Sequence, residues 1–505
     1  MATTKAPRKK KEQVKRSDLK IGIKDFGPIA EGEIELKPLT VFIGPNNSGK
    51  SYAAMLVRSI FEAHAVRFSW YERFPLIFAE KILPMDDENL QKMISDLESK
   101  VDALKQGEIL QIHNDTVEKL VKAGFRGIYE NRLGKEITHS YSCKLKDLTS
   151  FGKKSFSVSI GFSSYKFHLE YQEGKLIIKE FPELHEKFDL EIKSDWQAEN
   201  KEQKSAWIIA DEYVMTGAGW TGKSFPYVFV NALSLAIPSR MLESVMMPCY
   251  YLPASRTGTI LLYKGFSANV IKQLPLFGLD KQQEILNLSS IISDFISTMI
   301  EISDKEKGFY YQFAEELSMA LLKGDIVLIS EDKNLIPEIR YRFKGIDIPL
   351  HLASTSITEL APLILYLKYI VKPGSILIIE EPEAHLHPAN IRILAKYLVR
   401  LVNKGVNVLI TTHSEYLLEQ LDNFVMLSNI EPEERVERYG YEKDDFLKHT
   451  DFAVYEFHYD QNTGTSKIEK ARLTKKDGVS QDEFVKVFEE LYEETGKLRR
   501  DLSDE

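Results

Sequence analysis

One segment constrains the fold of this chain more than any other. Residues 44–51 read GPNNSGKS and match the pattern G-x-x-x-x-G-K-[S/T]. A short apolar run at 39–43 precedes them, and residues 52–68 follow with apolar side chains at helical spacing. In a strand–loop–helix of this kind, backbone N–H groups and the positive end of the helix point at phosphate oxygens. The sequence therefore predicts a phosphate-binding loop on a parallel α/β sheet.

The residue types of this loop each have a chemical use. Gly44 and Gly49 let the backbone curl, so that its N–H groups point inward. Lys50 can reach the β- and γ-phosphates, and the Ser51 hydroxyl can bind Mg²⁺. The residues predicted to bind the nucleotide here are Gly44, Pro45, Asn46, Asn47, Ser48, Gly49, Lys50, Ser51 and Tyr52.

Two adjacent carboxylates form the second motif. Glu380 and Glu381 follow the apolar run 376–379, which predicts a buried strand with both carboxylates at its carboxyl end. Ligands of open α/β sheets bind at that edge. One carboxylate can hold Mg²⁺ through water, and the next can orient and polarise an attacking water.

Two further segments carry polar side chains at element ends. His413 follows a predicted strand at 406–412, in one βαβ unit with the paired carboxylates, where it could contact a γ-phosphate. Ser354, Thr355 and Ser356 precede a predicted helix. Small hydroxyl residues at a helix N-terminus cap the helix or bind an anion, and both interpretations remain open here.

Together these motifs resemble the ABC-type ATPase superfamily. The correspondence places a Walker A motif at 44–51, a signature near 354–360, a Walker B motif at 376–381 and a switch histidine at 413. Within the superfamily, EEPEAHLHP at 380–388 and TTHSEYLL at 411–418 resemble the OLD-like ATPases, named for overcoming lysogenization defect. SMC and RecF proteins are more distant relatives. The resemblance implies an α/β P-loop ATPase head, with a mixed sheet flanked by helices and a large α+β insertion between Walker A and signature.

The resemblance also implies roles for the candidate residues. ATP and Mg²⁺ are the expected cofactors, with Ser51 and Glu380 on the metal. Lys50, Glu381 and His413 are the expected catalytic residues, Glu381 as the base. Ser354, Thr355 and Ser356 are expected at the nucleotide as the signature, although serine stands at 356 where the family has glycine. No Q-loop glutamine can be placed.

Three other residues have two interpretations each. Arg256 lies in YLPASRTG, a segment that resembles a recurrent one in OLD-like ATPases, and would either approach the nucleotide or hold the interface between lobes. His385 and His387 could be read as a metal pair, but HLHP is part of the family pattern.

The motif positions predict a split head. The expected organisation is a basic disordered tail at 1–17, the Walker A part of the head at 18–70, a helical and β-meander insertion at 71–325, the remainder of the head at 326–430, and a C-terminal hairpin with an acidic helix at 431–505. In that helix Phe484, Phe488 and Leu491 form an apolar stripe.

Composition limits the partners. The chain has 66 Lys and Arg against 75 Asp and Glu, a net charge of −9, which argues against a protein coated in nucleic acid. The two cysteines cannot build a disulfide framework and suit a reducing compartment. The longest uncharged apolar run, 225–238, is too short to span a bilayer. We therefore expect a cytoplasmic protein without a membrane partner.

The function expected from the resemblance is an ATPase that closes as a homodimer, or a higher homo-oligomer, around ATP. Residues after His413 lack the D-x-D pair of the TOPRIM nuclease domain found in OLD nucleases, so a separate effector, a nuclease or toxin, is expected as the partner. Antiphage defence is the expected setting. The alternatives are a RecF-type DNA-repair ATPase that binds DNA, and a nucleotide-gated scaffold with little turnover.

Overall fold

The computed structural model describes most of the chain. The described residues are 16–64, 88–105, 107–163, 165–183, 190–194, 206–210, 213–216, 245–262, 289–302, 306–329, 337–474, 478–479 and 492–500. Two predicted features, the basic tail up to residue 15 and the apolar stripe at 484–491, lie outside them.

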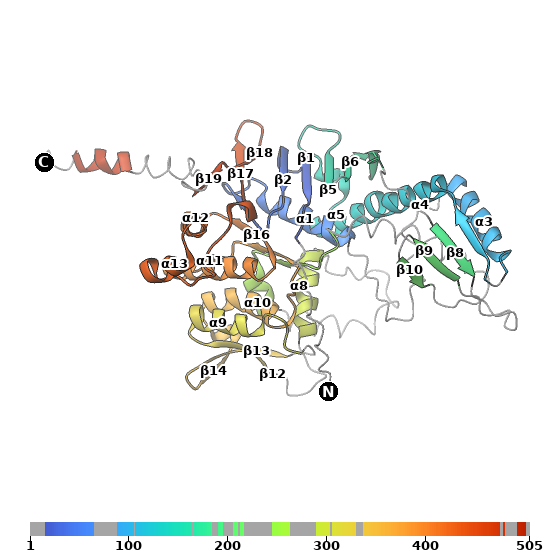
Figure 1. Ribbon diagram of the computed structural model, residues 1–505. Coiled ribbons are helices and arrows are strands. Elements are labelled where there is room, and N and C mark those ends of the chain that lie inside the picture. Colours follow the sequence, from blue (N-terminus) through green and yellow to red (C-terminus); the bar gives the residue numbers. More distant parts are fainter. Residues whose placement is uncertain are drawn as a thin grey trace, which may run out of the picture.

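A large mixed sheet organises the molecule (Figure 1). In spatial order its eleven strands are β11 (Cys249–Leu252), β15 (Ile376–Glu380), β16 (Asn407–Thr412), β3 (Leu39–Ile43), β17 (Phe452–Asp460), β18 (Thr465–Lys470), β2 (Ile29–Glu35), β1 (Lys20–Phe26), β5 (Ser157–Phe162), β6 (Tyr165–Gln172) and β7 (Lys175–Glu180). The first five strands run parallel to one another. From β17 onward the pairs are antiparallel, except β18 with β2. The predicted mixed α/β architecture is confirmed.

The parallel strands are apolar because helices cover both of their faces. Every residue of β3, β15 and β16 is buried, as expected for strands sandwiched between two helical layers. Along β15, Ile378 packs into the core on the side of the helix that follows the phosphate loop, and its neighbour Leu377 into the core on the other side. The main helices are α1 (Lys50–His64), α5 (Gly134–Tyr141), α8 (Ser290–Glu301), α9 (Tyr311–Leu322), α10 (Thr355–Tyr369), α11 (Pro388–Asn403) and α12 (Glu415–Leu427).

The antiparallel strands have one buried and one open face. In β1 the side chains of Ile21 and Ile23 enter the same core as α1, while Lys20 and Lys24 are exposed. The predicted meander is confirmed as β5, β6 and β7, and β5 pairs directly with β1. These strands therefore extend the central sheet, although they come from the stretch predicted as insertion.

Smaller elements surround the sheet (Figure 1). A four-stranded antiparallel sheet consists of β10 (Tyr213–Thr216), β9 (Ala206–Ala210), β8 (Leu190–Ser194) and β4 (Ile109–Ile112), and a three-stranded one of β12 (Asp325–Ile329), β13 (Glu338–Phe343) and β14 (Ile346–Pro349). The remaining elements are α3 (Glu88–Asp102), α4 (Asn114–Arg126), the π-helix η1 (Gly127–Leu133), the short 3₁₀ helices η2 (Leu145–Leu148), η6 (Leu350–Leu352) and η7 (His449–Asp451), α13 (Pro432–Tyr439), and the short pair β19 (Leu473–Thr474) and β20 (Gly478–Val479).

Candidate nucleotide site

The strand order brings the sequence motifs to one edge of the sheet. β16 lies between β3 and β15, and all three run in the same direction. The register pairs Ile43 with Thr412 and Glu380 with Thr411, so the three strands end at the same level. The loops after them therefore carry the phosphate-loop residues, the paired carboxylates and His413 to neighbouring positions.

The loop between β3 and α1 has the backbone that a phosphate cradle requires. Gly44 has φ 144°, Asn47 φ 62° and Gly49 φ 93°, all in the region that L side chains rarely adopt. A Cβ on Gly44 would lie 2.7 Å from the carbonyl oxygen of Phe457, so only glycine fits there. Pro45 to Asn47 are exposed, whereas Ser48 is buried and its hydroxyl has no hydrogen-bond partner.

Lys50 folds over this loop. Its Nζ donates hydrogen bonds to the carbonyl oxygens of Gly44 (2.9 Å) and Pro45 (2.8 Å). Burial lowers the pKa of Lys50 to about 8, and the nearby carboxylates of Glu381 and Glu383 oppose that shift. The ammonium is therefore largely charged at pH 7 and lies within the electrostatic reach of the carboxylates that end β15.

Glu380 is buried and held at both oxygens. The Tyr251 hydroxyl donates to its Oε1 (2.7 Å) and the Ala254 N–H to its Oε2 (2.8 Å). Because strand side chains alternate, Glu380 lies on the same side of the sheet as Ile376 and Ile378, which pack into the core shared with α1.

Glu381 has a strained backbone that its neighbours hold. Its φ is 44°, in the left-handed region that costs free energy for a residue with a Cβ. The Glu381 N–H donates to the Thr411 carbonyl (2.9 Å), and Arg256 Nη2 donates to the Glu381 carbonyl (2.9 Å). The side chain remains 44% exposed, and its Oε1 lies 3.6 Å from Nε2 of His413. This conformation turns the carboxylate out of the sheet edge toward His413.

His413 lies between the carboxylate and the phosphate loop. Burial lowers its pKa, and the positive charge of Lys50 adds to that effect, while Glu381 and a hydrogen bond to the backbone of Gly44 act in the opposite direction. The imidazole is therefore neutral at pH 7. It is one third exposed, so it remains accessible to a ligand at the loop.

Glu383 fixes the backbone next to His413. It accepts hydrogen bonds from the Thr412 hydroxyl and from the His413 N–H (3.3 Å). Its other oxygen is buried without a hydrogen-bond partner, and burial raises the pKa of this carboxyl. The loop after β15 and the loop after β16 are thus joined through one buried carboxyl.

The predicted signature residues lie apart from this cluster. Ser354 and Thr355 are exposed at the N-terminus of α10, and the Ser356 hydroxyl donates to the His385 carbonyl (2.7 Å). Ser354 does not cap α10 with its side chain. The contacts described for this segment join it to the loop around His385 rather than to the phosphate loop of the same chain.

The residues present fit an ATP phosphate tail and Mg²⁺. The buried hydroxyl of Ser48, the left-handed loop backbone and the N-terminus of α1 suit phosphate oxygens. Ser51 is exposed on the first turn of α1, and Glu380 supplies a carboxylate on the same side of the sheet. Hydroxyl and carboxylate oxygens are ligands that Mg²⁺ prefers.

Arg256 and His387 make protein contacts in the structure. Arg256 is 1% exposed, and every partner described for it is a protein carbonyl or carboxylate. Nδ1 of His387 accepts from the Ala389 N–H (3.2 Å) and so caps α11. In the described part of the chain, no group of three or more His, Cys, Asp or Glu side chains is placed to hold a metal ion.

Sequence reasoning missed several residues that build this site. The bonds of Tyr251 and Ala254 to Glu380 span 129 and 126 residues of sequence, and no local pattern predicts them. Glu383 is visible in the EEPE motif, but its partners belong to a different strand. Glu359, an acidic residue in an otherwise apolar stretch of α10, is the signal that could have indicated a buried ion pair.

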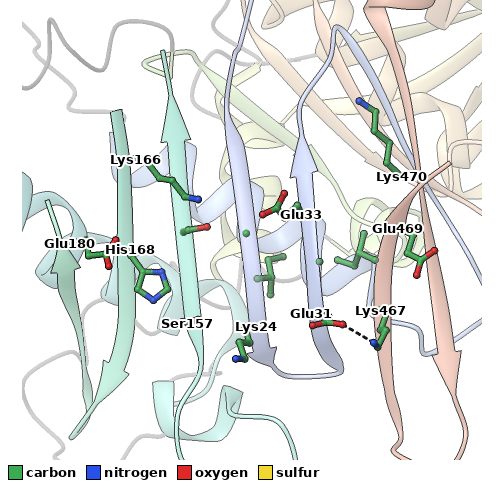
Figure 2. A pocket seen from close by; sticks show the side chains of 15 residues that line it. Lys24, Glu31, Glu33, Ser157, Lys166, His168, Glu180, Lys467, Glu469 and Lys470 are labelled. Carbon is green, nitrogen blue, oxygen red and sulfur yellow. Dashed lines mark ion pairs between the residues drawn. The ribbon is translucent and has the colours of Figure 1, made fainter. Parts of the chain in front are cut away.

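A groove on the open face of the sheet is a second feature (Figure 2). It encloses about 700 Å³ over β18, β2, β1 and β5 to β7. Gly22 and Gly32 form part of its floor, and none of the nucleotide-site residues lines it. Its charged walls mix both signs, with Lys24, Lys166, Lys467 and Lys470 opposing Glu31, Glu33, Glu180 and Glu469.

The comparisons with known proteins identify one domain. A family model described as an AAA ATPase domain matches residues 262–418, less than a third of the chain. The match includes the signature segment, the paired carboxylates and His413, and it excludes the loop at 44–51. No curated protein matches this chain.

Several solved structures share a distant likeness with the chain. An Smc head bound to the C-winged helix domain of ScpA is 13% identical, with a TM-score of 0.38 over 91% of this chain and 98% of that one. The SMC head domain from Thermotoga maritima is 11% identical, with a TM-score of 0.33 over 91% and 100%. The recombination mediator RecF of the RecFOR pathway is 10% identical, with a TM-score of 0.33 over 91% and 100%.

Residues 262–418 are therefore similar to an AAA ATPase domain, and they contribute β15 and β16 to the mixed α/β sheet. None of the helices in the described ranges is both long and apolar enough to cross a membrane.

Proposed function

We propose that this chain binds ATP with Mg²⁺ at the loop 44–51 and hydrolyses it. The observation that carries this proposal is the convergence of Lys50, Glu381 and His413 at the ends of three parallel strands. A charged amine, an exposed carboxylate and a neutral imidazole around a phosphate cradle are the groups that phosphoryl transfer to water needs.

The proposed mechanism assigns one task to each group. Backbone N–H groups of the loop and the ammonium of Lys50 bind the phosphates and balance their charge. Glu381 accepts a proton from water as the water oxygen bonds to the γ-phosphorus, and the bond to the β–γ bridging oxygen breaks to leave ADP and phosphate. His413 holds the γ-phosphate by a hydrogen bond. Mg²⁺ held by Ser51 and Glu380 would supply further charge neutralisation.

The signature segment supports assembly around ATP. Ser354 and Thr355 are exposed at the N-terminus of α10, and their segment contacts the loop around His385. A helix N-terminus of this kind suits an anion held by another chain. We propose that two copies close with ATP between them, each copy presenting its signature to the nucleotide on the other, in a dimer or in a larger assembly built from such dimers.

The partner that we propose is a separate effector, a nuclease or toxin, in antiphage defence. The OLD-like motifs support this by resemblance, with EEPEAHLHP at 380–388 as the main signal. The DNA-binding alternative needs a basic surface, and the groove on the open sheet face has four lysines balanced by four glutamates. That balance favours a protein partner for this face over a phosphate backbone.

ATP hydrolysis by purified variants tests the catalytic proposal. Lys50→Ala should lose ATP binding, and Glu381→Gln should retain binding while turnover falls at least about 100-fold, the usual contribution of a general base. Lys92→Ala and Glu437→Gln, both at exposed helix positions, serve as matched controls with wild-type turnover. Unchanged hydrolysis in Glu381→Gln would remove Glu381 from the catalytic role.

The effector proposal has its own test. Tagged Glu381→Gln chain, which should hold ATP, is recovered from its native cells and its partners are identified by mass spectrometry, with Lys50→Ala as control. A nuclease or toxin enriched on the ATP-holding variant supports the proposal. If only copies of the chain itself, or only DNA-repair proteins, are recovered, the effector proposal fails.

A further inference from the structure

The turn that follows β11 makes unusual contacts at the carboxylates. β11 is the edge strand beside β15, and it pairs Leu252 with Ile379. Two residues beyond Leu252, the Ala254 N–H donates to one oxygen of Glu380. Tyr251, which precedes Leu252, donates from its hydroxyl to the other oxygen of the same carboxylate. Both oxygens of Glu380 are therefore held by one short segment.

Arg256 extends this segment to helix α10. Its guanidinium donates to the carbonyl oxygens of Glu380 and Glu381, and Nη2 lies 2.5 Å from Oε1 of Glu359. Nε also donates to the Glu359 carbonyl (3.2 Å), and the Thr257 hydroxyl binds the Glu359 carboxylate. Arg256 and Glu359 are each only 2% exposed at the side chain.

Burying the Arg256–Glu359 ion pair costs free energy, so its burial at this position needs a physical explanation. Removing a guanidinium and a carboxylate from water costs several kcal/mol, which is recovered only when the geometry is good and the remaining donors are satisfied. Here each end of the guanidinium has acceptors, including two backbone carbonyls at the end of β15. The planar fork of arginine presents five donors in a fixed geometry, which the three rotatable donors of a lysine do not reproduce.

We propose that residues 251–256 act as a brace that positions the metal-binding carboxylate Glu380 and, through Arg256 and Glu359, fixes it to the signature end of α10. The proposal rests on the proposed ATP and Mg²⁺ site. Tyr251 and Arg256 are positioning residues, since they act through Glu380 and the backbone of Glu381. In a dimer, each chain would thus couple the carboxylate at its own nucleotide to the signature that it presents to the other.

Tyr251→Phe tests the first arm of the brace. The change removes one hydroxyl from a buried ring and leaves Glu380 with one donor fewer. Loss of such an outer partner of a metal ligand typically weakens metal binding about 10- to 100-fold. In EDTA, we expect the affinity for a fluorescent N-methylanthraniloyl-ATP to stay at the wild-type value. Mg²⁺ should raise that affinity in both chains, and the Mg²⁺ concentration that gives half of this increase should be at least about tenfold higher in Tyr251→Phe.

Tyr310→Phe is the matched control, because Tyr310 is also buried and its hydroxyl donates to a backbone carbonyl, that of Lys404 (2.8 Å). It should leave the Mg²⁺ dependence unchanged. A wild-type Mg²⁺ dependence in Tyr251→Phe would overturn the proposal. If the wild-type chain binds no ATP, the proposed function fails instead, so the two failures are distinguishable.

Glu359→Gln tests the link to α10. Glu359 contacts Arg256 and Thr257 but makes no described contact with Glu380, so we expect its effect on the Mg²⁺ dependence to be transmitted through Arg256 and the adjoining Thr257. We expect the half-saturating Mg²⁺ concentration to rise in Glu359→Gln, as in Tyr251→Phe. In the variant that combines both changes, the fold-increase should be smaller than the product of the two single fold-increases. Arg256→Lys should behave like Glu359→Gln. The link to α10 would be overturned if the two single fold-increases multiplied in the double variant, or if Glu359→Gln left the half-saturating Mg²⁺ concentration unchanged.

Discussion

At the residue scale, charge and burial around Lys50 determine how the site responds to pH. Burial lowers the pKa of this lysine to about 8, although two carboxylates nearby favour its charged form. A bound nucleoside triphosphate would favour the charged form of Lys50 further, because nearby negative charge raises the pKa of an amine. At the proposed site, binding of ATP above pH 8 would therefore be coupled to uptake of a proton by Lys50.

This coupling predicts that ATP affinity falls at high pH. Since the charged lysine is the binding form, affinity should be constant below the pKa and lost above it. Between pH 7 and pH 9 we expect a loss of about tenfold, as the charged fraction falls by that factor for a pKa near 8. Equilibrium titration with a fluorescent ATP analogue measures it. Lys50→Arg, which stays charged, should show a flat profile, and an equal decline in that variant would exclude Lys50 as its source.

Glu383 provides a second prediction at this scale. Glu383→Gln keeps an oxygen that can accept from Thr412 and the His413 N–H, whereas Glu383→Ala leaves both donors unpaired. A buried donor without a partner costs about 1–3 kcal/mol, so the loop that carries His413 should lose its position in the alanine variant. We expect turnover in Glu383→Ala to be at least about tenfold below that of Glu383→Gln. Equal turnover in the two variants would show that the bonds to this carboxyl do not matter.

The limits of sequence-based prediction are visible among these residues. Lys50 and Glu381 follow from local patterns, because a glycine-rich loop before a helix and a carboxylate after an apolar run each have a local physical reason. Tyr251 and Glu359 do not, because their importance arises from contacts across more than 100 residues of sequence. Such contacts depend on which strand lies at the sheet edge, and alternation of apolar residues contains no information about that.

At the element scale, the phosphate loop depends on the strand beside it as much as on its own sequence. β17 runs parallel to β3, and its Phe457 carbonyl limits the space at Gly44. A Cβ at this glycine would lie 2.7 Å from that oxygen, which is too close for either backbone to tolerate without moving. β17 therefore helps to shape the site, although none of its residues was predicted there.

Gly44→Ala tests this dependence. We expect ATP affinity to fall at least about tenfold, because the loop must shift away from β17 and its φ of 144° suits only glycine. Gly174→Ala is the control, since Gly174 also has a positive φ, 91°, but has open space around its Cβ position. Its affinity for ATP should equal that of the wild-type chain, and a normal affinity in Gly44→Ala would contradict the steric argument.

The alternating meander and the buried apolar strands were predicted, whereas two short strands within a polar stretch were not. The predicted meander appears as β5 to β7, and the two predicted strands of the βαβ unit appear as β15 and β16. The stretch 193–224 reads as a polar loop, yet Ala206–Ala210 and Tyr213–Thr216 form strands. Four- and five-residue strands flanked by polar sequence give too short a pattern to separate from a loop. They become stable only by pairing, here β9 with β8 and β10 with β9.

At the scale of the whole molecule, the proposed assembly around ATP requires an exposed signature segment. The signature end of α10 is exposed, and Gly44 of the phosphate loop lies next to Phe457 of β17 in the same chain. We expect Glu381→Gln with ATP and Mg²⁺ to shift toward a dimer or larger assembly, measured by sedimentation velocity, because hydrolysis can no longer reopen it. Under the same conditions, Lys50→Ala should keep the sedimentation-coefficient distribution that it has without nucleotide. The same distribution in both variants would contradict assembly around ATP.

The pairing of distant strands also has a consequence for synthesis of the chain. The Glu35 N–H donates to the Tyr455 hydroxyl, a bond between residues 420 positions apart, and β3 is enclosed by strands of similarly late origin. At roughly 5–20 residues per second, a ribosome needs about 20–80 s to cover that distance. During that time the apolar strand Leu39–Ile43 has been made and its partners have not, so a molecular chaperone has a defined period in which to bind it.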